Sequence, residues 1–571
     1  ARDARRRSPA SACPRAGPIP MTDASTQCRA PPEPGPTPFL YRVIRNWFRL
    51  CAAGFYATTE VYGKENVPAN GEPTILCFNH GNGLADPLVL IRKTKRMVRF
   101  CAKDSLWSVP IMKYFVRNSG AVPVYRAREH GDKAKEFNLE VFRKVIAALR
   151  EGDCLGFAPE GVSRFLPYME QPLKTGVARI ALDAVKLATE AGDPDFAVKI
   201  VPVGLSYTHR EKFRSDLCMR YMPPIVVNAT LINQFLHKDG STDTFALAKK
   251  ITNELSEAID GATINSPTWE VLRLAITATR LYSPVGTALS LGQYLTLVRG
   301  WVQVLKLGVP VPEGADNGKG GTVPTAAELT TVEGLRAALG AYQDLLDVKG
   351  IKCERVRRAF LHGQALPWYF CITGMAQRVL MLTVCFVLAA PGLLVFSPLW
   401  KYLKRRERFL LSKGPRWNDS VAEMKMMTCG LAGMAFAVGN TLASLYWMSW
   451  KPAAFVYYMY VTMRCYEEGV AAARSAYSHY KLLLLSPAEM ASMVKLRTAA
   501  KAAMDPAITM LPKGVVDELA LSADEARPTR ALDYYVPWIL ARVIMLTLRR
   551  RKKDWNEVLR LKDHATMDYV S

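Results

Sequence analysis

The order of apolar and polar residues between residues 73 and 210 predicts an α/β domain. Short apolar runs bounded by turn-forming residues are typical of buried strands, and longer stretches with helical periodicity separate them. We expect strands at residues 74–78, 120–125, 154–158 and 199–207, and helices at residues 133–150 and 177–191. Strands that alternate with helices indicate a sheet flanked by helices.

Two long uncharged segments in the second half of the chain predict a membrane-embedded region. Residues 379–399 and residues 426–450 contain no Asp, Glu, Lys or Arg, and about 20 apolar residues are enough to cross the hydrocarbon core of a bilayer. Pro391 and Gly392 break the first segment midway. Two spans, or one re-entrant hairpin followed by one span, both fit, and a buried helical hairpin of a soluble domain is the alternative.

The whole pattern divides the chain into six parts. Residues 39–65 mix aromatic and aliphatic side chains with arginines, as expected of a helix in a membrane interface or of an amphipathic core helix. Residues 1–20 fit a translated leader or disordered tail better than a transit peptide. We expect a disordered leader at 1–38, the interfacial helix at 39–65, the α/β domain at 66–245, a helical extension at 246–376 with a Gly/Pro-rich linker at 310–324, a membrane-embedded region at 377–485 and a C-terminal helical tail at 486–571.

The charge balance points to anionic partners. Lys and Arg outnumber Asp and Glu by 75 to 51, which gives a net charge of +24 and favours nucleic acid, acidic lipid headgroups or phosphate-bearing substrates. Because the basic residues are spread out and no recognition motif appears, nucleic acid is the least favoured of these. The 12 cysteines and 7 histidines show no zinc spacing, so we expect no metal site.

The segment FNHGNGLADP, directly after the predicted strand at 74–78, is the strongest local indication of chemistry. The imidazole of His80 is suited to removing a proton from a hydroxyl near neutral pH. A carboxylate on the other ring nitrogen fixes the tautomer and stabilises the imidazolium, and Asp86 is the candidate for this role. A turn-forming loop without catalytic function is the alternative at this point.

Three further segments follow in order. GAVPVYR places the guanidinium of Arg126 at the end of a strand, where it can bind a phosphate. In FAPEGVSR, Gly161 permits close backbone approach, while Ser163 and Arg164 offer donors to a phosphate. VPVGLSY, at residues 201–207, is a later apolar strand. Each segment alone also fits an ordinary surface feature.

Taken together, the four segments resemble the glycerolipid acyltransferase family that includes bacterial lysophosphatidate acyltransferase. That family has an NH block with an Asp, a G-x-x-x-x-x-R block, an F-x-x-E-G block and a V-P-V-G block. Further segments resemble the fungal and protist glycerol-3-phosphate/dihydroxyacetone-phosphate acyltransferases, so that the resemblance covers roughly residues 38–485. These segments are residues 170–182, 200–216, 279–291, 390–399 and 460–470.

The resemblance implies His80 as general base with Asp86 as its partner. It also implies that Arg126, Glu160, Gly161 and Arg164 bind the acceptor or the transition state, and we add Ser163 and Lys174 as phosphate contacts. Two features depart from the family pattern. Five residues separate His80 from Asp86 where four are usual, and the third block contains EGVSR where EGTR is usual.

The implied reaction is transfer of a fatty acyl group from acyl-CoA to glycerol 3-phosphate, with dihydroxyacetone phosphate as a second acceptor. Acyl-CoA is then a co-substrate, and no bound cofactor is expected. The resemblance also implies a lipid membrane as partner, in the endoplasmic reticulum, with the catalytic domain facing the cytosol. A lysophospholipid acyltransferase and an inactive membrane scaffold of the same fold are the alternatives.

Overall fold

The computed structural model describes most of the chain between residues 38 and 515. The predicted leader and most of the predicted C-terminal tail therefore lie outside the described residues. Within this range the described residues exclude 109, 126–129, 132, 214, 236–242, 283–288, 316–323, 352, 354–355, 357–367, 415–418 and 448–449.

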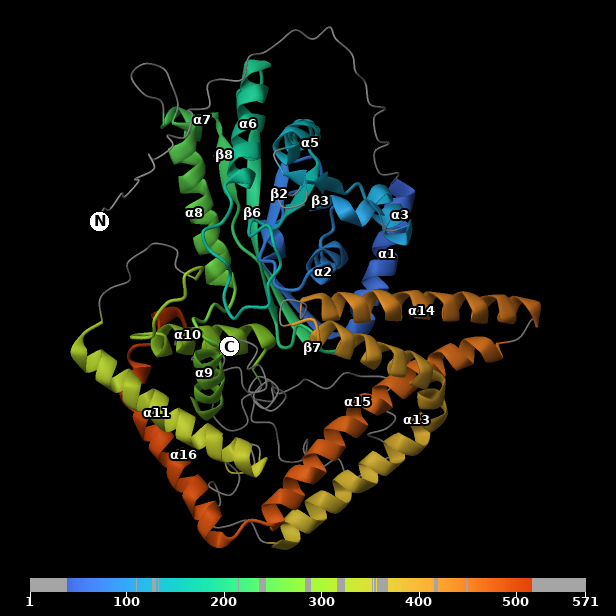
Figure 1. The fold of residues 1–571 in the computed structure, drawn as a ribbon, viewed down its shortest axis with the longest axis vertical. Helices are drawn as coiled ribbons and strands as arrows, with labels where there is room; N and C mark the ends of the chain where they lie inside the picture. The colour runs from blue at the N-terminus through green and yellow to red at the C-terminus, as the bar shows by residue number, and fades with distance from the viewer. Residues whose placement is uncertain are drawn as a thin grey trace, which may run out of the picture.

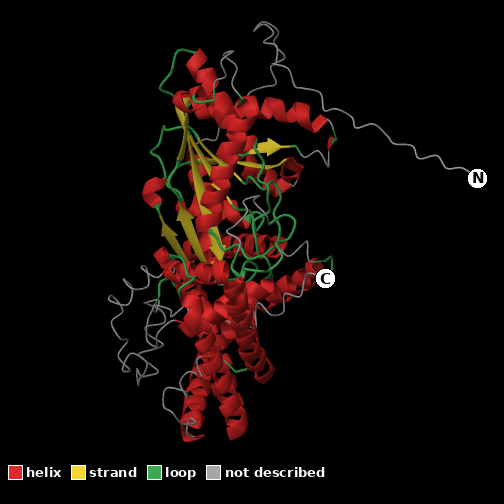
Figure 2. Cartoon of the chain, turned by 90° about the vertical axis from the view of Figure 1, so that its left-hand side faces the viewer, coloured by secondary structure: helices red, strands yellow, loops and turns green. Residues whose placement is uncertain are grey.

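An eight-stranded mixed sheet forms the centre of the N-terminal half (Figures 1 and 2). The strand order is β1-β7-β6-β2-β5-β3-β4, and β8 pairs with β6 beside β7. The strands β2, β3, β4, β5 and β6 run parallel, whereas β7 and β8 run antiparallel to β6. The strands are β1 (Tyr56–Tyr62), β2 (Thr74–Phe78), β3 (Val98–Lys103), β4 (Val122–Val124), β5 (Cys154–Phe157), β6 (Ala197–Tyr207), β7 (Ser215–Tyr221) and β8 (Ile225–Asn228).

Helices cover both faces of this sheet, as the sequence predicts. Side chains of successive residues in a strand point to opposite faces, and β2 shows the consequence. Ile75 and Cys77 pack in one buried cluster with α5 (Lys133–Arg150), α6 (Gly176–Glu190) and α8 (Thr244–Ala262). Leu76 and Phe78 pack in another with α1 (Pro38–Phe55) and α2 (Ala85–Lys93). The predicted strands β2, β4, β5 and β6 and the predicted helices α5 and α6 are confirmed.

The predicted helix at residues 39–65 is wrong in its second half. The helix α1 ends at Phe55, and the next seven residues form β1, which pairs parallel with β7. The β-branched residues Thr58, Thr59 and Val61 favour this extended conformation. One face of α1 is buried against the domain, while Leu50 on the opposite face is 72% exposed.

Two predicted boundaries also differ from the structure. The apolar side of α8 packs on the sheet, so the α/β unit continues past residue 245 to Ala262. Near the C-terminus, α16 (Pro487–Ile508) packs with the helical extension instead of forming a separate tail. Its buried residues Met493 and Met504 share one core with α9 (Trp269–Tyr282), α10 (Leu291–Leu305) and α11 (Ala326–Lys349).

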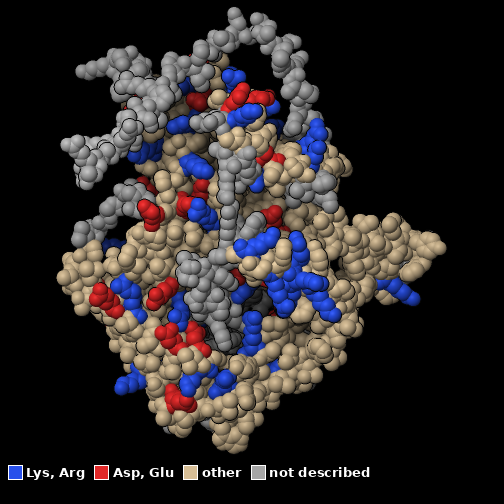
Figure 3. All heavy atoms as spheres, in the orientation of Figure 1, with Lys and Arg blue, Asp and Glu red and all other residues tan. Residues whose placement is uncertain are grey.

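The predicted membrane-embedded region consists of long helices, α13 (Trp368–Leu411), α14 (Asp419–Tyr446) and α15 (Lys451–Leu483). Among the described residues, α13 and α14 are long and apolar enough to cross a membrane, and only 22% and 6% of their most apolar stretches are buried. Figure 3 shows few charged side chains on the projecting end where α14 and α15 meet (compare Figure 1). Large apolar side chains therefore face outward, unlike those of a buried hairpin.

Pro391 and Gly392 do not end the first apolar helix, contrary to the prediction. Instead α13 continues through Pro391 as one bent helix (Figure 1). The Tyr458 hydroxyl of α15 accepts a hydrogen bond from Gly392 N (3.3 Å) and donates one to Leu388 O (2.9 Å). A hydroxyl inserted between these two backbone groups is a known cause of helix bending. The basic run at residues 401–408 forms the last turns of α13.

Candidate active site

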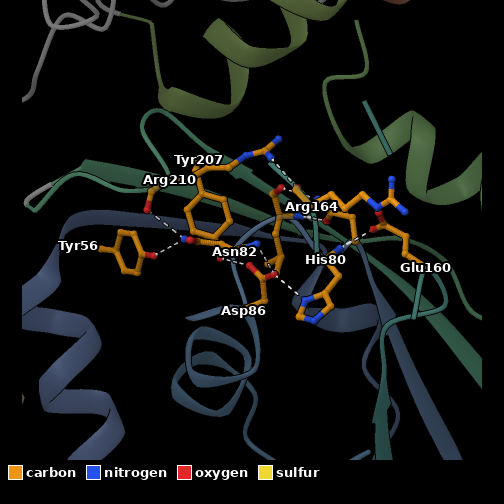
Figure 4. A network of polar contacts seen from close by, with 10 residues as sticks. Tyr56, His80, Asn82, Asp86, Glu160, Arg164, Tyr207 and Arg210 are labelled. Atoms are coloured by element: carbon orange, nitrogen blue, oxygen red, sulfur yellow. Dashed lines mark hydrogen bonds and ion pairs between the residues drawn. The ribbon is translucent and has the colours of Figure 1, made fainter. Parts of the chain in front are cut away.

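The loop after β2 brings His80 and Asp86 together (Figure 4). His80 Nδ1 lies 3.0 Å from Asp86 Oδ2, and the Asp86 side chain is 0% exposed. The backbone N–H of Asn82 donates to the same oxygen at 2.9 Å. Gly83 has a φ of +49°, a conformation that favours glycine. The five-residue spacing therefore still forms the predicted pair, while its catalytic role stays a prediction.

Two further residues hold the carboxylate of Asp86 and the loop around it. The hydroxyl of Tyr207, at the end of β6, donates to Asp86 Oδ1 at 2.5 Å. Burial, and next the charge of Asp86, raise the pKa of Tyr207 well above its usual value, so the hydroxyl keeps its proton. The Asn82 side-chain amide donates to Tyr56 Oη and to the backbone oxygen of Arg210, each at 3.0 Å.

Glu160, which follows β5, lies directly behind His80. Its Oε1 accepts a hydrogen bond from the backbone N–H of His80 at 2.5 Å, and its Oε2 accepts one from Glu170 N at 3.3 Å. Burial raises the pKa of the Glu160 carboxyl. Gly161 has a φ of +76°, and the ammonium end of Lys174 occupies the space that a Cβ would need. The contacts of Glu160 thus position the loop that carries His80.

The residues predicted to contact a phosphate differ in their exposure and in their partners. The backbone N–H of Arg164 donates to His80 O at 3.4 Å, but its side chain is 56% exposed and pairs with Glu170 at 3.0 Å. Ser163 is half-buried beside it, and Lys174 is exposed. Arg126 lies outside the described residues. These roles stay predictions.

A cavity of about 90 Å³ adjoins the loop. Asn79 and Gly81, on either side of His80, line it together with Glu160 and Arg210. The imidazole of His80 is directed at Asp86 (Figure 4), and His80 itself is not among the residues that line the cavity. The opposite wall comes from α9 and α10 and includes Trp269, Leu272, Ile276, Leu295 and Val298.

Sequence reasoning did not identify Tyr56, Asn82, Tyr207 and Arg210. Tyr207 and Arg210 are close to the VPVGLSY segment, and Asn82 lies inside the NHGNG loop, so the segments were found but not these side chains. Among the described residues, no group of three or more His, Cys, Asp or Glu side chains is placed to hold a metal ion.

The His80 loop and most of the sheet lie in a stretch that is similar to a known family. Residues 58–206 match the model of the Acyltransferase family, and this stretch contains His80, Asp86, Glu160 and Arg164.

Two curated proteins of Saccharomyces cerevisiae are similar to the chain. It is 31% identical over 264 residues to Glycerol-3-phosphate O-acyltransferase 2, which covers 46% of this chain and 31% of the relative. It is 28% identical over 305 residues to Glycerol-3-phosphate O-acyltransferase 1, covering 52% and 35%. The chain thus spans about a third of the length of these relatives.

A solved structure, the 1-acyl-sn-glycerophosphate (LPA) acyltransferase PlsC from Thermotoga maritima, is also similar. It is 16% identical in sequence and covers 38% of this chain and 78% of its own, with a TM-score of 0.26.

Proposed function

We propose that the protein is a glycerol-3-phosphate 1-O-acyltransferase that uses acyl-CoA as acyl donor. The similarity to the two yeast glycerol-3-phosphate O-acyltransferases carries the proposal. The buried His80–Asp86 contact at 3.0 Å supports it, because acyl transfer to a hydroxyl needs a base. Dihydroxyacetone phosphate is a second acceptor with the same type of hydroxyl and phosphate.

His80 acts as the base in this proposal. Its Nδ1–H donates to Asp86, which leaves Nε2 as the nitrogen that accepts the proton of the acceptor hydroxyl. The acceptor oxygen attacks the thioester carbonyl carbon, and the carbon–sulfur bond then breaks. The imidazolium returns the proton to the departing thiolate of coenzyme A. Atoms and charges balance without a covalent intermediate on the protein and without a bound cofactor.

The other site residues position these groups. Glu160 holds the backbone N–H of His80, and Tyr207 holds the second oxygen of Asp86. Arg126, Gly161, Ser163, Arg164 and Lys174 are proposed contacts to the acceptor, on the family resemblance of their segments.

The membrane is proposed as the destination of the acylated product. The outward-facing apolar surfaces of α13 and α14 fit a lipid environment. We place the protein in the endoplasmic reticulum membrane with the catalytic domain facing the cytosol, where acyl-CoA and glycerol 3-phosphate are water-soluble substrates.

An acceptor comparison tests the proposed function. The protein purified in detergent or lipid nanodiscs is supplied with labelled acyl-CoA and, in separate reactions, with glycerol 3-phosphate, dihydroxyacetone phosphate or lysophosphatidate. We expect the highest kcat/KM with glycerol 3-phosphate. Acylation of lysophosphatidate alone contradicts the proposal and makes the protein a lysophospholipid acyltransferase. Absence of transfer to all three acceptors contradicts an enzymatic role and favours a scaffold.

A further inference from the structure

Arg210 presents a guanidinium to the cavity beside the catalytic loop. Its Nη1 donates to the backbone oxygen of Arg164 at a long 3.4 Å, and its Cζ lies 5.3 Å from the centre of the Phe165 ring. Among the described residues, no carboxylate forms an ion pair with it. A guanidinium that lines a cavity and is not ion-paired with a carboxylate is suited to binding an anion such as a phosphate.

The guanidinium of Arg210 lies beside Gly81, the residue that follows His80. A Cβ on Gly81 would lie only 3.0 Å from Arg210 Nη1, so the absence of a side chain at residue 81 allows this approach. The backbone oxygen of Arg210 accepts a hydrogen bond from the Asn82 amide at 3.0 Å. These contacts fix the position of Arg210 relative to the loop that carries the proposed base.

Trp269 adds a second donor to the same cavity. Its indole N–H is buried and has no hydrogen-bond partner among the described residues. The Trp269 ring is tilted by 30° to the Phe165 ring, with centroids 5.6 Å apart. The Arg210 guanidinium lies over the same Phe165 ring. Arg210 and Trp269 thus place two donors in the lining of the same cavity, and both contact the Phe165 ring.

The other charges around the cavity fit the same interpretation. Arg164 pairs with Glu170 and is 56% exposed, so its charge is already compensated. Glu160 also lines the cavity, but both of its oxygens accept backbone N–H groups. Burial raises the pKa of Glu160. Burial lowers the pKa of Arg210, and the charges of Asp86 and Glu160 oppose this shift.

We propose that this cavity is a phosphate-binding site and that Arg210, assisted by the Trp269 indole, binds the phosphate. Arg210 is then a substrate-binding residue. The inference rests on the proposed function for the source of the phosphate, which is the glycerol 3-phosphate acceptor. Coenzyme A carries phosphates as well, so the experiment measures both substrates.

Arg210→Gln removes the charge and keeps a polar side chain. A hydrogen bond to a charged group contributes about 1.5–3 kcal/mol, so we expect the KM for glycerol 3-phosphate to rise about 10- to 100-fold, with little change in the KM for acyl-CoA. Arg210→Lys keeps the positive charge but loses the planar guanidinium, which can donate two parallel hydrogen bonds. We therefore expect a smaller rise in the KM for glycerol 3-phosphate. The matched control is Arg143→Gln, which removes an exposed guanidinium on α5 and leaves both KM values unchanged.

Trp269→Phe keeps an aromatic ring and removes the N–H. Because this donor binds a charged phosphate in the proposal, its loss should raise the KM for glycerol 3-phosphate by about 10-fold. A rise in the KM for acyl-CoA alone keeps the phosphate site but assigns it to coenzyme A. Unchanged KM values for both substrates in folded Arg210→Gln and Trp269→Phe protein overturn the proposal.

A binding measurement separates this proposal from the proposed function. Inorganic phosphate is titrated into the full-length protein in detergent, and the Tm is followed without any turnover. We expect phosphate to raise the Tm of the wild type and of Arg143→Gln, and to leave that of Arg210→Gln unchanged. If the wild type acylates no phosphorylated acceptor but shows this pattern, the proposed function fails and the phosphate site stands. An equal phosphate response in Arg210→Gln rejects the site whatever the activity.

Discussion

The acyltransferase domain contains a second His–Asp contact whose surroundings differ from those of His80 and Asp86. His130 Nε2 lies 2.7 Å from Asp104 Oδ2, about as close as the 3.0 Å of the first pair. Asp104 is 18% exposed, and its Oδ1 has no hydrogen-bond partner among the described residues. Both oxygens of Asp86, in contrast, accept hydrogen bonds.

A short His–Asp distance occurs at both places, so distance alone does not single out the proposed catalytic pair. His130 packs against the ring of Tyr125, with centroids 5.3 Å apart, and its neighbours do not line the cavity. His80 lies on a loop whose backbone is held by Glu160 and whose flanking residues do line it. Orientation of the base and access to a ligand distinguish the two regions, and the following variants test this difference.

His80→Ala is expected to have the largest effect. General base catalysis contributes about 10²- to 10⁴-fold to a rate, so kcat for acyl transfer should fall by about 10³-fold. The His80 side chain is 20% exposed, and its truncation should leave the fold intact. His130→Ala, the matched control, should lower the Tm slightly and keep kcat. Equal losses of activity in the two variants would remove the distinction between the pairs.

Asp86→Asn is expected to have the next largest effect. The amide is neutral, and its nitrogen cannot accept the hydrogen bonds that the carboxylate receives from Tyr207 or from His80 and Asn82. The imidazolium then loses its counter-charge, and we expect kcat to fall by about 10²- to 10³-fold. Asp104→Asn is the control and should keep kcat near the wild-type value. Single-turnover assays at several pH values measure both.

Tyr207→Phe should reduce activity less. It removes one donor to Asp86 Oδ1 and leaves the His80 and Asn82 contacts on Oδ2. Loss of a hydrogen bond to a charged group corresponds to about a 10-fold effect on kcat, with the pH profile shifted because the Asp86 charge is less stabilised. Tyr125→Phe, next to His130, is the control. An unchanged pH profile with a lower Tm would make the role of Tyr207 purely structural.

The parts of the fold that the sequence predicted are those with a local pattern. The apolar run of β2 and the helical periodicity of α5 identify these elements without knowledge of their neighbours. β1 was missed because aromatic and aliphatic residues continue from α1 into it, and its extended conformation depends on pairing with β7. The break predicted at Pro391 and Gly392 is absent, because the Tyr458 hydroxyl, 66 residues from Gly392, binds the backbone there and lets α13 continue.

The candidate site was predictable to a similar extent. His80 and Asp86 are in one short segment, so their pairing followed from the sequence. Tyr207 and Arg210 reach the same loop only because β2 and β6 are parallel neighbours whose carboxyl ends meet at one edge of the sheet. No spacing in the sequence reports that contact, and the resemblance supplied segments without the hydrogen bonds between them.

Glu160→Gln should have the smallest effect on stability and a defined pH dependence, and it tests the backbone support that distinguishes the His80 region. Burial raises the pKa of Glu160 above its usual 4.5, so the folded protein binds this proton more tightly than the unfolded chain. The wild type then loses stability as the pH rises from about 4.5 through the raised folded pKa, while the variant cannot ionise. The Tm of Glu160→Gln minus that of the wild type should therefore increase over this window by about 1–3 °C and stay constant above it.

Glu140→Gln, on the surface of α5, controls for the loss of one carboxylate. A difference that decreases with rising pH would show that the hydrogen bonds to His80 N and Glu170 N outweigh the cost of burying the Glu160 charge.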